Sequence, residues 1–130
     1  MDEFSFISEL LSPLSGPEGL GLLDDAALLT PREGYDLVLT KDSLIESVHF
    51  PTGQYGVNTA HKLLRSNLSD LAAKGAKPIG YLLSLALPLP HQISKDELCE
   101  FAKGLEEVQS QYGFKLFGGD TTSGLSLIHI

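Results

Sequence analysis

The clearest pattern of apolar and polar positions lies in the middle of the chain. Its apolar side chains recur at the spacing of one buried helix face: Leu63, Leu64, Leu68, Leu71 and Ala72. That spacing predicts an amphipathic helix that Asn58 caps and that ends near Gly75. Asn67 falls on the same buried face, and Asp70 lies at its edge. A buried amide or carboxylate costs on the order of 1–3 kcal/mol when unpaired, so both side chains need a hydrogen-bond partner, a cation or a ligand.

Two further segments carry a helical pattern. The first covers residues 3–11. The second starts at a capping box formed by Ser94 and Glu97, and Gly113 ends it. Its apolar stripe consists of Leu98, Phe101, Ala102, Leu105 and Val108. Because each helix has one apolar face, each must pack against another layer of the fold.

Short apolar or alternating runs between these helices predict strands. They cover residues 26–29, 35–40, 47–50, 79–87 and 114–117. Strands interspersed with helices in this way predict an α+β domain in which helices cover a single mixed sheet.

Aspartate side chains stand at the junctions between these elements. Four of them follow a loop or a predicted strand: Asp24, Asp25, Asp42 and Asp120. Junction loops bring distant side chains together, so these four and Asp70 can form one acidic pocket. Crowded carboxylates repel one another unless cations neutralise them, and oxygen ligands favour Mg²⁺. Because Mg²⁺ keeps positions open for phosphate oxygens, the aspartates indicate phosphate chemistry.

A glycine pair precedes the last of these aspartates. Gly118 and Gly119 carry no side chain, so their backbone can approach a phosphate closely, and Thr121 and Thr122 follow Asp120 as further donors. The Lys that a P-loop requires is absent from this segment, which excludes that motif.

Composition narrows the classes of partner. The 130 residues carry a formal net charge of −8, 42% hydrophobic residues and a mean hydropathy of +0.07. These values predict a folded soluble domain, and the lack of a basic stripe argues against binding to nucleic acid. The longest apolar run, 81–89, is too short to cross a bilayer. With one cysteine, Cys99, and no signal-like start, we expect no disulfide, no membrane segment and a cytoplasmic location.

Several ordered motifs resemble a known family. They run along nearly the whole chain, at residues 3–7, 24–29, 40–50, 67–78, 83–88 and 118–122. Together they are similar to the N-terminal domain of the thiamine-monophosphate kinases, in the superfamily that includes aminoimidazole ribonucleotide synthetase. The resemblance implies a homodimer and ATP-dependent phosphorylation of thiamine monophosphate to thiamine diphosphate. Direct, Mg²⁺-assisted transfer between two phosphates needs no nucleophile from the protein, so no catalytic residue is expected.

The resemblance also implies roles for individual residues. The implied magnesium ligands are Asp25, Thr40, Asp42, Asp70 and Asp120. Gly119 and Asp120 would contact ATP, and His49 would contact the substrate. The role of Asp24 stays open, because adjacent carboxylates in an extended segment point to opposite faces.

Three positions depart from the family's pattern. Leu23 stands in place of Gly, Lys41 in place of a second hydroxyl residue, and Ser123 in place of Arg. Lys41 either brings its own positive charge to phosphate or points to solvent. Two other interpretations therefore stay open: a non-catalytic dimerisation or ligand-binding module, and another ATP-using member of the superfamily with a different acceptor.

The same resemblance implies the domain organisation. Residues 1–124 correspond to the N-terminal domain that binds metal, ATP and substrate, and the family's C-terminal domain is absent. Residues 125–130 alternate as a strand would, yet they equal the translation of a common sequencing-adapter end, so we expect an artefactual terminus. Because the second domain completes the ATP site, we expect little or no kinase activity from these residues alone.

Overall fold

The structure, a computed structural model, describes residues 3–23, 26–87, 93–124 and 127–129. Four strands in these ranges form one sheet in the order β1-β4-β2-β3. The strands are β1 (Ser43–Ile45), β2 (Gly80–Leu87), β3 (Lys115–Ser123) and β4 (Leu127–His129). β2 pairs with β3 in parallel, whereas β4 lies antiparallel between β1 and β2. The predicted α+β fold with a single mixed sheet is confirmed.

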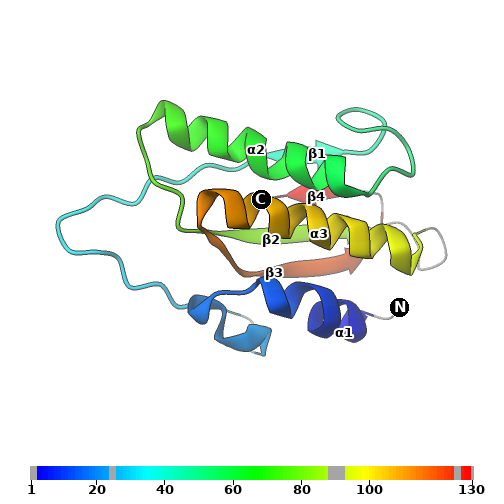
Figure 1. Ribbon diagram of the computed structural model, residues 1–130, viewed down its shortest axis with the longest axis horizontal. Coiled ribbons are helices and arrows are strands. Elements are labelled where there is room, and N and C mark those ends of the chain that lie inside the picture. The colour runs from blue at the N-terminus through cyan, green and yellow to red at the C-terminus, as the bar shows by residue number, and fades with distance from the viewer. Residues whose placement is uncertain (1–2, 24–25, 88–92, 125–126, 130) are drawn as a thin grey trace.

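Two long helices lie over one face of the sheet (Figure 1). They are α2 (Val57–Ala73) and α3 (Lys95–Tyr112), and α3 connects the parallel strands β2 and β3. The predicted ends of α3 are confirmed: Ser94 and Glu97 form the capping box, and Gly113 ends the helix with a φ of +72°. Of the described helices, none is long and apolar enough to cross a lipid bilayer.

The start of α2 differs from the prediction. Its N-cap is Gly56 and not Asn58, because the extended backbone of Gly56 already turns the chain into the helix. At the other end, Gly75 has a φ of +68° and donates its N–H to Ala72 O at 2.9 Å. The helix therefore stops where the sequence predicts, at the residue that accepts a left-handed backbone most readily.

The N-terminal segment lies beside β3 (Figure 1). α1 (Glu3–Phe6) continues directly into the π-type turn η1 (Ile7–Leu11), which confirms the predicted helix over residues 3–11. Two 3-10 turns follow, η2 (Ser12–Leu14) and η3 (Pro17–Leu22).

Three predicted strands are wrong: residues 26–29, 35–40 and 47–50 form no strand in the described structure. Residues 26–42 run instead as an irregular chain that loops away from the sheet (Figure 1), and Leu39 is 89% exposed. A strand needs a neighbour for its N–H and C=O groups, and the described sheet offers none to this segment. In the third run, Ser47 has a φ of +65°, which turns the chain out of an extended conformation.

The hydrophobic core lies between the two long helices and the sheet. Its most deeply buried side chains are Leu63, Leu64, Leu85, Leu105, Leu116, Ile128 and Val108. Tyr81 Oη donates to Gln109 Oε1 at 2.7 Å, and Gln109 Nε2 donates to Leu14 O at 3.1 Å. This buried chain of hydrogen bonds ties β2 and α3 to η2. Burial also raises the pKa of the Tyr81 phenol far above its ordinary value, because the ionised form would lose its hydration.

We predict that Tyr81→Phe lowers the free energy of unfolding by about 1–3 kcal/mol, because it leaves Gln109 Oε1 buried without its donor. Urea denaturation followed by circular dichroism measures this difference. The matched control is Tyr112→Phe, at a tyrosine that is 44% exposed; its effect should stay within about 0.5 kcal/mol. The gap between wild type and Tyr81→Phe should narrow above roughly pH 10, because there the phenol ionises in the unfolded chain only. Equal effects of the two substitutions would contradict the role of this hydrogen bond.

Candidate functional site

The C-terminal half of α2 carries the first candidate group. Thr40 Oγ1 donates to Asp70 Oδ2 at 3.3 Å, which joins two segments thirty positions apart. Two of the implied magnesium ligands therefore lie together. Thr40 is half-buried and Asp70 is exposed, so both oxygen-bearing side chains remain accessible to a cation.

Asn67 lies one turn earlier on α2 and is only 5% exposed. Its Nδ2 donates to Leu63 O at 2.9 Å, whereas its Oδ1 has no hydrogen-bond partner among the residues that the structure describes. A buried acceptor left unpaired costs about 1–3 kcal/mol. Of the two polar groups of Asn67, only the amide N–H thus has the predicted partner, which is a backbone carbonyl of the same helix.

Asp42 is half-buried just before β1, two positions after Thr40. Between them, Lys41 is exposed, and its Nζ lies 3.5 Å from Ser43 Oγ. The Lys41 side chain therefore runs along its own segment toward Ser43, at the long limit of a hydrogen bond.

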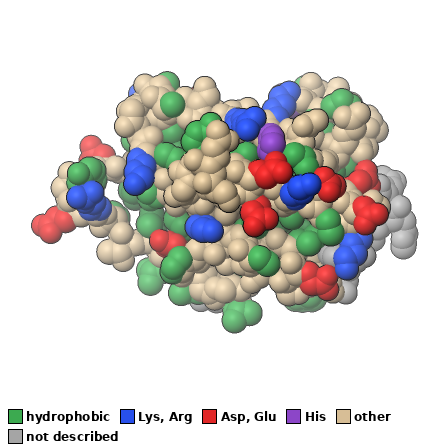
Figure 2. All heavy atoms as spheres, viewed as in Figure 1, with side chains coloured by type: hydrophobic (Ala, Val, Ile, Leu, Met, Phe, Trp, Pro, Cys, Tyr) green, Lys and Arg blue, Asp and Glu red, His purple; other side chains and the backbone are tan. Residues whose placement is uncertain are grey.

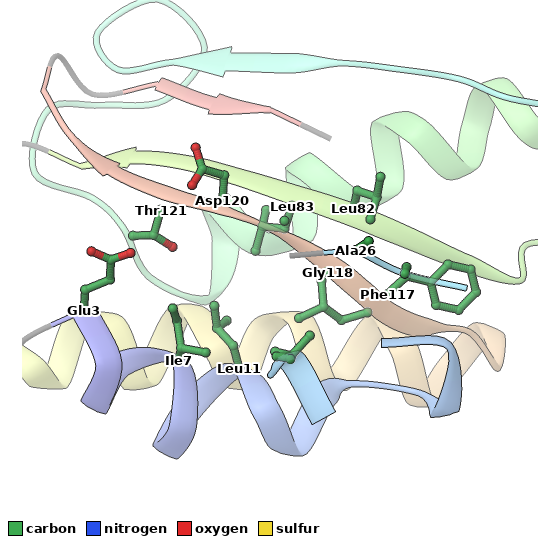
Figure 3. A pocket seen from close by; sticks show the side chains of 14 residues that line it. Glu3, Ile7, Leu11, Ala26, Leu82, Leu83, Phe117, Gly118, Asp120 and Thr121 are labelled. Carbon is green, nitrogen blue, oxygen red and sulfur yellow. The ribbon is translucent and has the colours of Figure 1, made fainter. Parts of the chain in front are cut away.

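The second candidate group lines a pocket of about 370 Å³ between the N-terminal helix and β3 (Figure 3). Glu3, Asp120 and Thr121 supply polar groups, and Gly118 and Gly119 contribute backbone without side chains. Apolar side chains complete the lining, among them Ile7, Leu11 and Phe117. An apolar lining with a few polar groups is typical of a small-molecule site.

The glycine pair in this pocket also has a structural role. A Cβ on Gly119 would lie 1.7 Å from Leu83 O on the paired strand, whereas a Cβ on Gly118 would meet Leu82 Cδ2 at 3.7 Å, an ordinary contact. Both glycines have the same φ of +157°. Gly119 thus permits the close approach of β3 to β2, while its contact with ATP stays a prediction.

His49 lies in the loop between β1 and α2. Ile45 N donates to His49 Nδ1 at 2.9 Å, and His49 N donates to Ile45 O at 2.8 Å. Lys62 Nζ, on α2, donates to His49 O. The loop is therefore attached to both neighbouring elements, while the His49 side chain stays exposed.

One residue of this loop, Glu46, was not predicted from the sequence. Glu46 Oε1 accepts a hydrogen bond from Gly53 N at 2.6 Å, and Glu46 Oε2 accepts one from Tyr55 Oη at 2.8 Å. The only signal in the sequence is an acidic residue close to His49 and followed by a Pro- and Gly-containing turn, a pattern common in surface loops.

The described residues bring two of the five implied metal ligands into contact. Thr40 and Asp70 are in contact, whereas Asp120 lines the pocket at β3. Asp25, like Asp24, lies outside the described residues. Within the part of the chain that the structure describes, no group of three or more His, Cys, Asp or Glu side chains could hold a metal ion. The implied ligands are all oxygen atoms, which suits Mg²⁺, and their meeting at one metal site stays a prediction.

Comparisons with known proteins agree on one family. Residues 23–129 match the AIR synthase related proteins, N-terminal domain. The chain is 48% identical over 126 residues to the thiamine-monophosphate kinase of Caulobacter vibrioides. The matched region covers 94% of this chain and 35% of that protein.

Solved structures give the same result. The fold is similar to thiamine-monophosphate kinase from Stenotrophomonas maltophilia K279a, with a TM-score of 0.74 and 41% identity over 83% of this chain and 33% of that one. It is also similar to AaThiL complexed with AMPPCP and TMP, with a TM-score of 0.63 and 27% identity over 69% of this chain and 28% of that one. The chain thus spans about a third of the length of the relatives it matches.

We predict that Gly119→Ala destabilises the fold by more than about 3 kcal/mol, because the new methyl group must push β3 away from β2. Gly118→Ala is the matched control, since it has the same φ but an ordinary contact distance. Urea denaturation of the two variants measures the difference. If both variants lose the same stability, the backbone conformation explains why glycine is needed at these positions, and the close approach of the strands does not.

Proposed function

Since the chain belongs to the AIR synthase related proteins through their N-terminal domain, we propose that it is part of a magnesium-dependent thiamine-monophosphate kinase. The reaction transfers the γ-phosphoryl group of ATP to the phosphate of thiamine monophosphate and yields thiamine diphosphate. Residues 1–124 are the N-terminal domain of this enzyme. The contact between Thr40 and Asp70 carries the proposal, because it brings together two of the proposed oxygen ligands of Mg²⁺ from separate segments of the chain.

Transfer between two phosphates requires alignment and neutralisation of charge more than covalent help from the protein. In this proposal the protein supplies the oxygen ligands Asp25, Thr40, Asp42, Asp70 and Asp120. Bound Mg²⁺ would offset the repulsion between the two polyanions. Such neutralisation by cations matters in a chain that itself has a net charge of −8. Figure 2 shows acidic side chains gathered over α3 on the face in view.

The geometry of α2 supports this assignment. Lys62 contacts the His49 loop and Asp70 contacts Thr40, so one helix holds both the proposed acceptor contact and the proposed metal ligands. Lys62 and Asp70 are eight helical positions apart, which corresponds to roughly 12 Å along the axis of α2.

The pocket at β3 supports the nucleotide end of the site. Gly119 and Asp120 line it, and so does Ala26, the neighbour of Asp25 in the chain. ATP is proposed to place its phosphates here, where glycine backbone permits a close approach.

Thermal unfolding of the chain with Mg²⁺, AMPPCP and thiamine monophosphate tests the proposal. We expect a magnesium-dependent rise in Tm of several degrees, because ligand at 100 times its Kd contributes about 2.7 kcal/mol to stability. Asp70→Asn should remove this rise. Asp96→Asn, at an exposed carboxylate on α3, should retain it. A rise of equal size in EDTA, or in Asp70→Asn, would refute the magnesium site.

A homodimer forms part of the same proposal, with residues 26–42 as its contact segment. This segment exposes Leu28, Leu37, Val38 and Leu39, and it adds no strand to the described sheet. A run of exposed apolar side chains is characteristic of an interface, and its alternating pattern suits pairing of strands between copies. A cytoplasmic location is proposed as well, because ATP and thiamine monophosphate are water-soluble substrates.

We predict that Leu39→Glu converts a dimer into a monomer, because it would place a charge in the apolar contact. Sedimentation velocity at micromolar concentration gives the oligomeric state. Phe4→Glu is the control, since Phe4 is also strongly exposed but lies on α1. A Leu39→Glu variant that sediments as the wild type does would exclude this segment as the interface.

A further inference from the structure

Several side-chain hydrogen bonds fix the loop of residues 46–55. Glu46 closes it, because its two carboxylate oxygens bind Gly53 N at 2.6 Å and Tyr55 Oη at 2.8 Å. Tyr55 is only 2% exposed and packs edge-on against Phe50, with ring centroids 5.5 Å apart. Through Tyr55, Glu46 therefore connects an exposed loop to the hydrophobic core.

The same loop contains a strained residue. Ser47 is not a glycine, yet it has a φ of +65°, in the left-handed region. Its Oγ lies 2.6 Å from Thr52 Oγ1, across the loop. Backbone strain of this kind persists only where the surroundings over-determine the conformation, and it clusters at ligand sites. The strain thus points to a required geometry at the neighbouring His49.

The hydrogen bonds also define the chemical form of His49. Because Ile45 N–H donates to Nδ1, that nitrogen carries no proton, and the neutral ring has its proton on Nε2. The His49 side chain is exposed, so the Nε2–H group is accessible as a donor. A fixed N–H donor suits an anionic oxygen such as that of a phosphate monoester.

We propose that Glu46 is a positioning residue for His49. By closing the loop, it keeps His49 in the tautomer with the proton on Nε2, and this N–H donates to a phosphate oxygen of the acceptor. The inference rests on the proposed function, in which His49 contacts thiamine monophosphate. Glu46 acts through the loop, because its carboxylate accepts hydrogen bonds from Gly53 N and Tyr55 Oη.

The first part of the test needs no ligand. Long-range ¹H–¹⁵N correlation spectra of the ¹⁵N-labelled chain report which imidazole nitrogen carries the proton. We expect the Nε2–H tautomer in the wild type and a mixture of tautomers in Glu46→Ala. Glu46→Gln, which keeps one acceptor oxygen, should retain most of the wild-type form. If Glu46→Ala keeps the wild-type tautomer, the positioning role is overturned.

The matched control for this test is Glu97→Ala. Glu97 is a half-buried carboxylate that also accepts two hydrogen bonds, from Ser94 N at 2.9 Å and Ser94 Oγ at 3.0 Å. This substitution imposes a comparable structural loss far from His49 in sequence, and it should leave the tautomer unchanged. If Glu46→Ala does not fold, the same spectra of Tyr55→Phe decide, because this substitution keeps the ring and removes the hydroxyl that donates to Glu46.

The second part uses thiamine monophosphate, with unphosphorylated thiamine as the control ligand. Thiamine monophosphate should shift the His49 Nε2 signal and bind about tenfold more weakly to Glu46→Ala, whereas thiamine should cause no shift. If the tautomer depends on Glu46 but thiamine monophosphate leaves His49 unshifted, the acceptor contact is overturned. That outcome would remove His49 from the proposed function, yet the magnesium-dependent rise in Tm would still test the kinase site separately.

Discussion

The parallel pairing of β2 with β3 is the constraint on which the rest of the structure depends. Each strand supplies a glycine where the other approaches: a Cβ on Gly80 would lie 2.1 Å from Phe117 Cζ, and one on Gly119 would lie 1.7 Å from Leu83 O. Parallel strands require a crossover, so the pairing also fixes α3 over the sheet. Asp120 follows directly after the closest approach, so the pairing of β3 with β2 positions the backbone of this residue.

α2 connects the hydrophobic core to His49 and Thr40. One side of the helix buries Leu63 and Leu64 in the core, and other positions contact the His49 loop and Thr40. Its packing on α3 is close at Gly104, where a Cβ would lie 2.8 Å from Ala60 Cβ. His61 and Glu107 add a 2.7 Å contact between the two helices. Any displacement of α2 would therefore move the His49 loop and the contact between Thr40 and Asp70 together, because both are attached to this helix.

The helices could be predicted from the sequence because their signals are local, as at the capping box of Ser94 and Glu97. Strands depend on partners elsewhere, so alternation over residues 35–40 predicted a strand for which the described sheet has no place. Thr40 and Asp70 are in contact, but their role as metal ligands stays a prediction, and Asp25 lies outside the described residues. Glu46 was missed because its importance arises only when the loop closes and brings Gly53 and Tyr55 to one carboxylate.

The irregular chain over residues 26–42 has a consequence for proteolysis. Its exposed turn over residues 32–35, where the Arg32 guanidinium carbon lies 4.5 Å from the centre of the Tyr35 ring, is the kind of tip that proteases cleave first. A nick there would not release the N-terminal helix, because Gln109 Nε2 still binds Leu14 O inside the core. The cleaved molecule would remain one folded body made of two polypeptides, a split form that could be reassembled from separately made pieces.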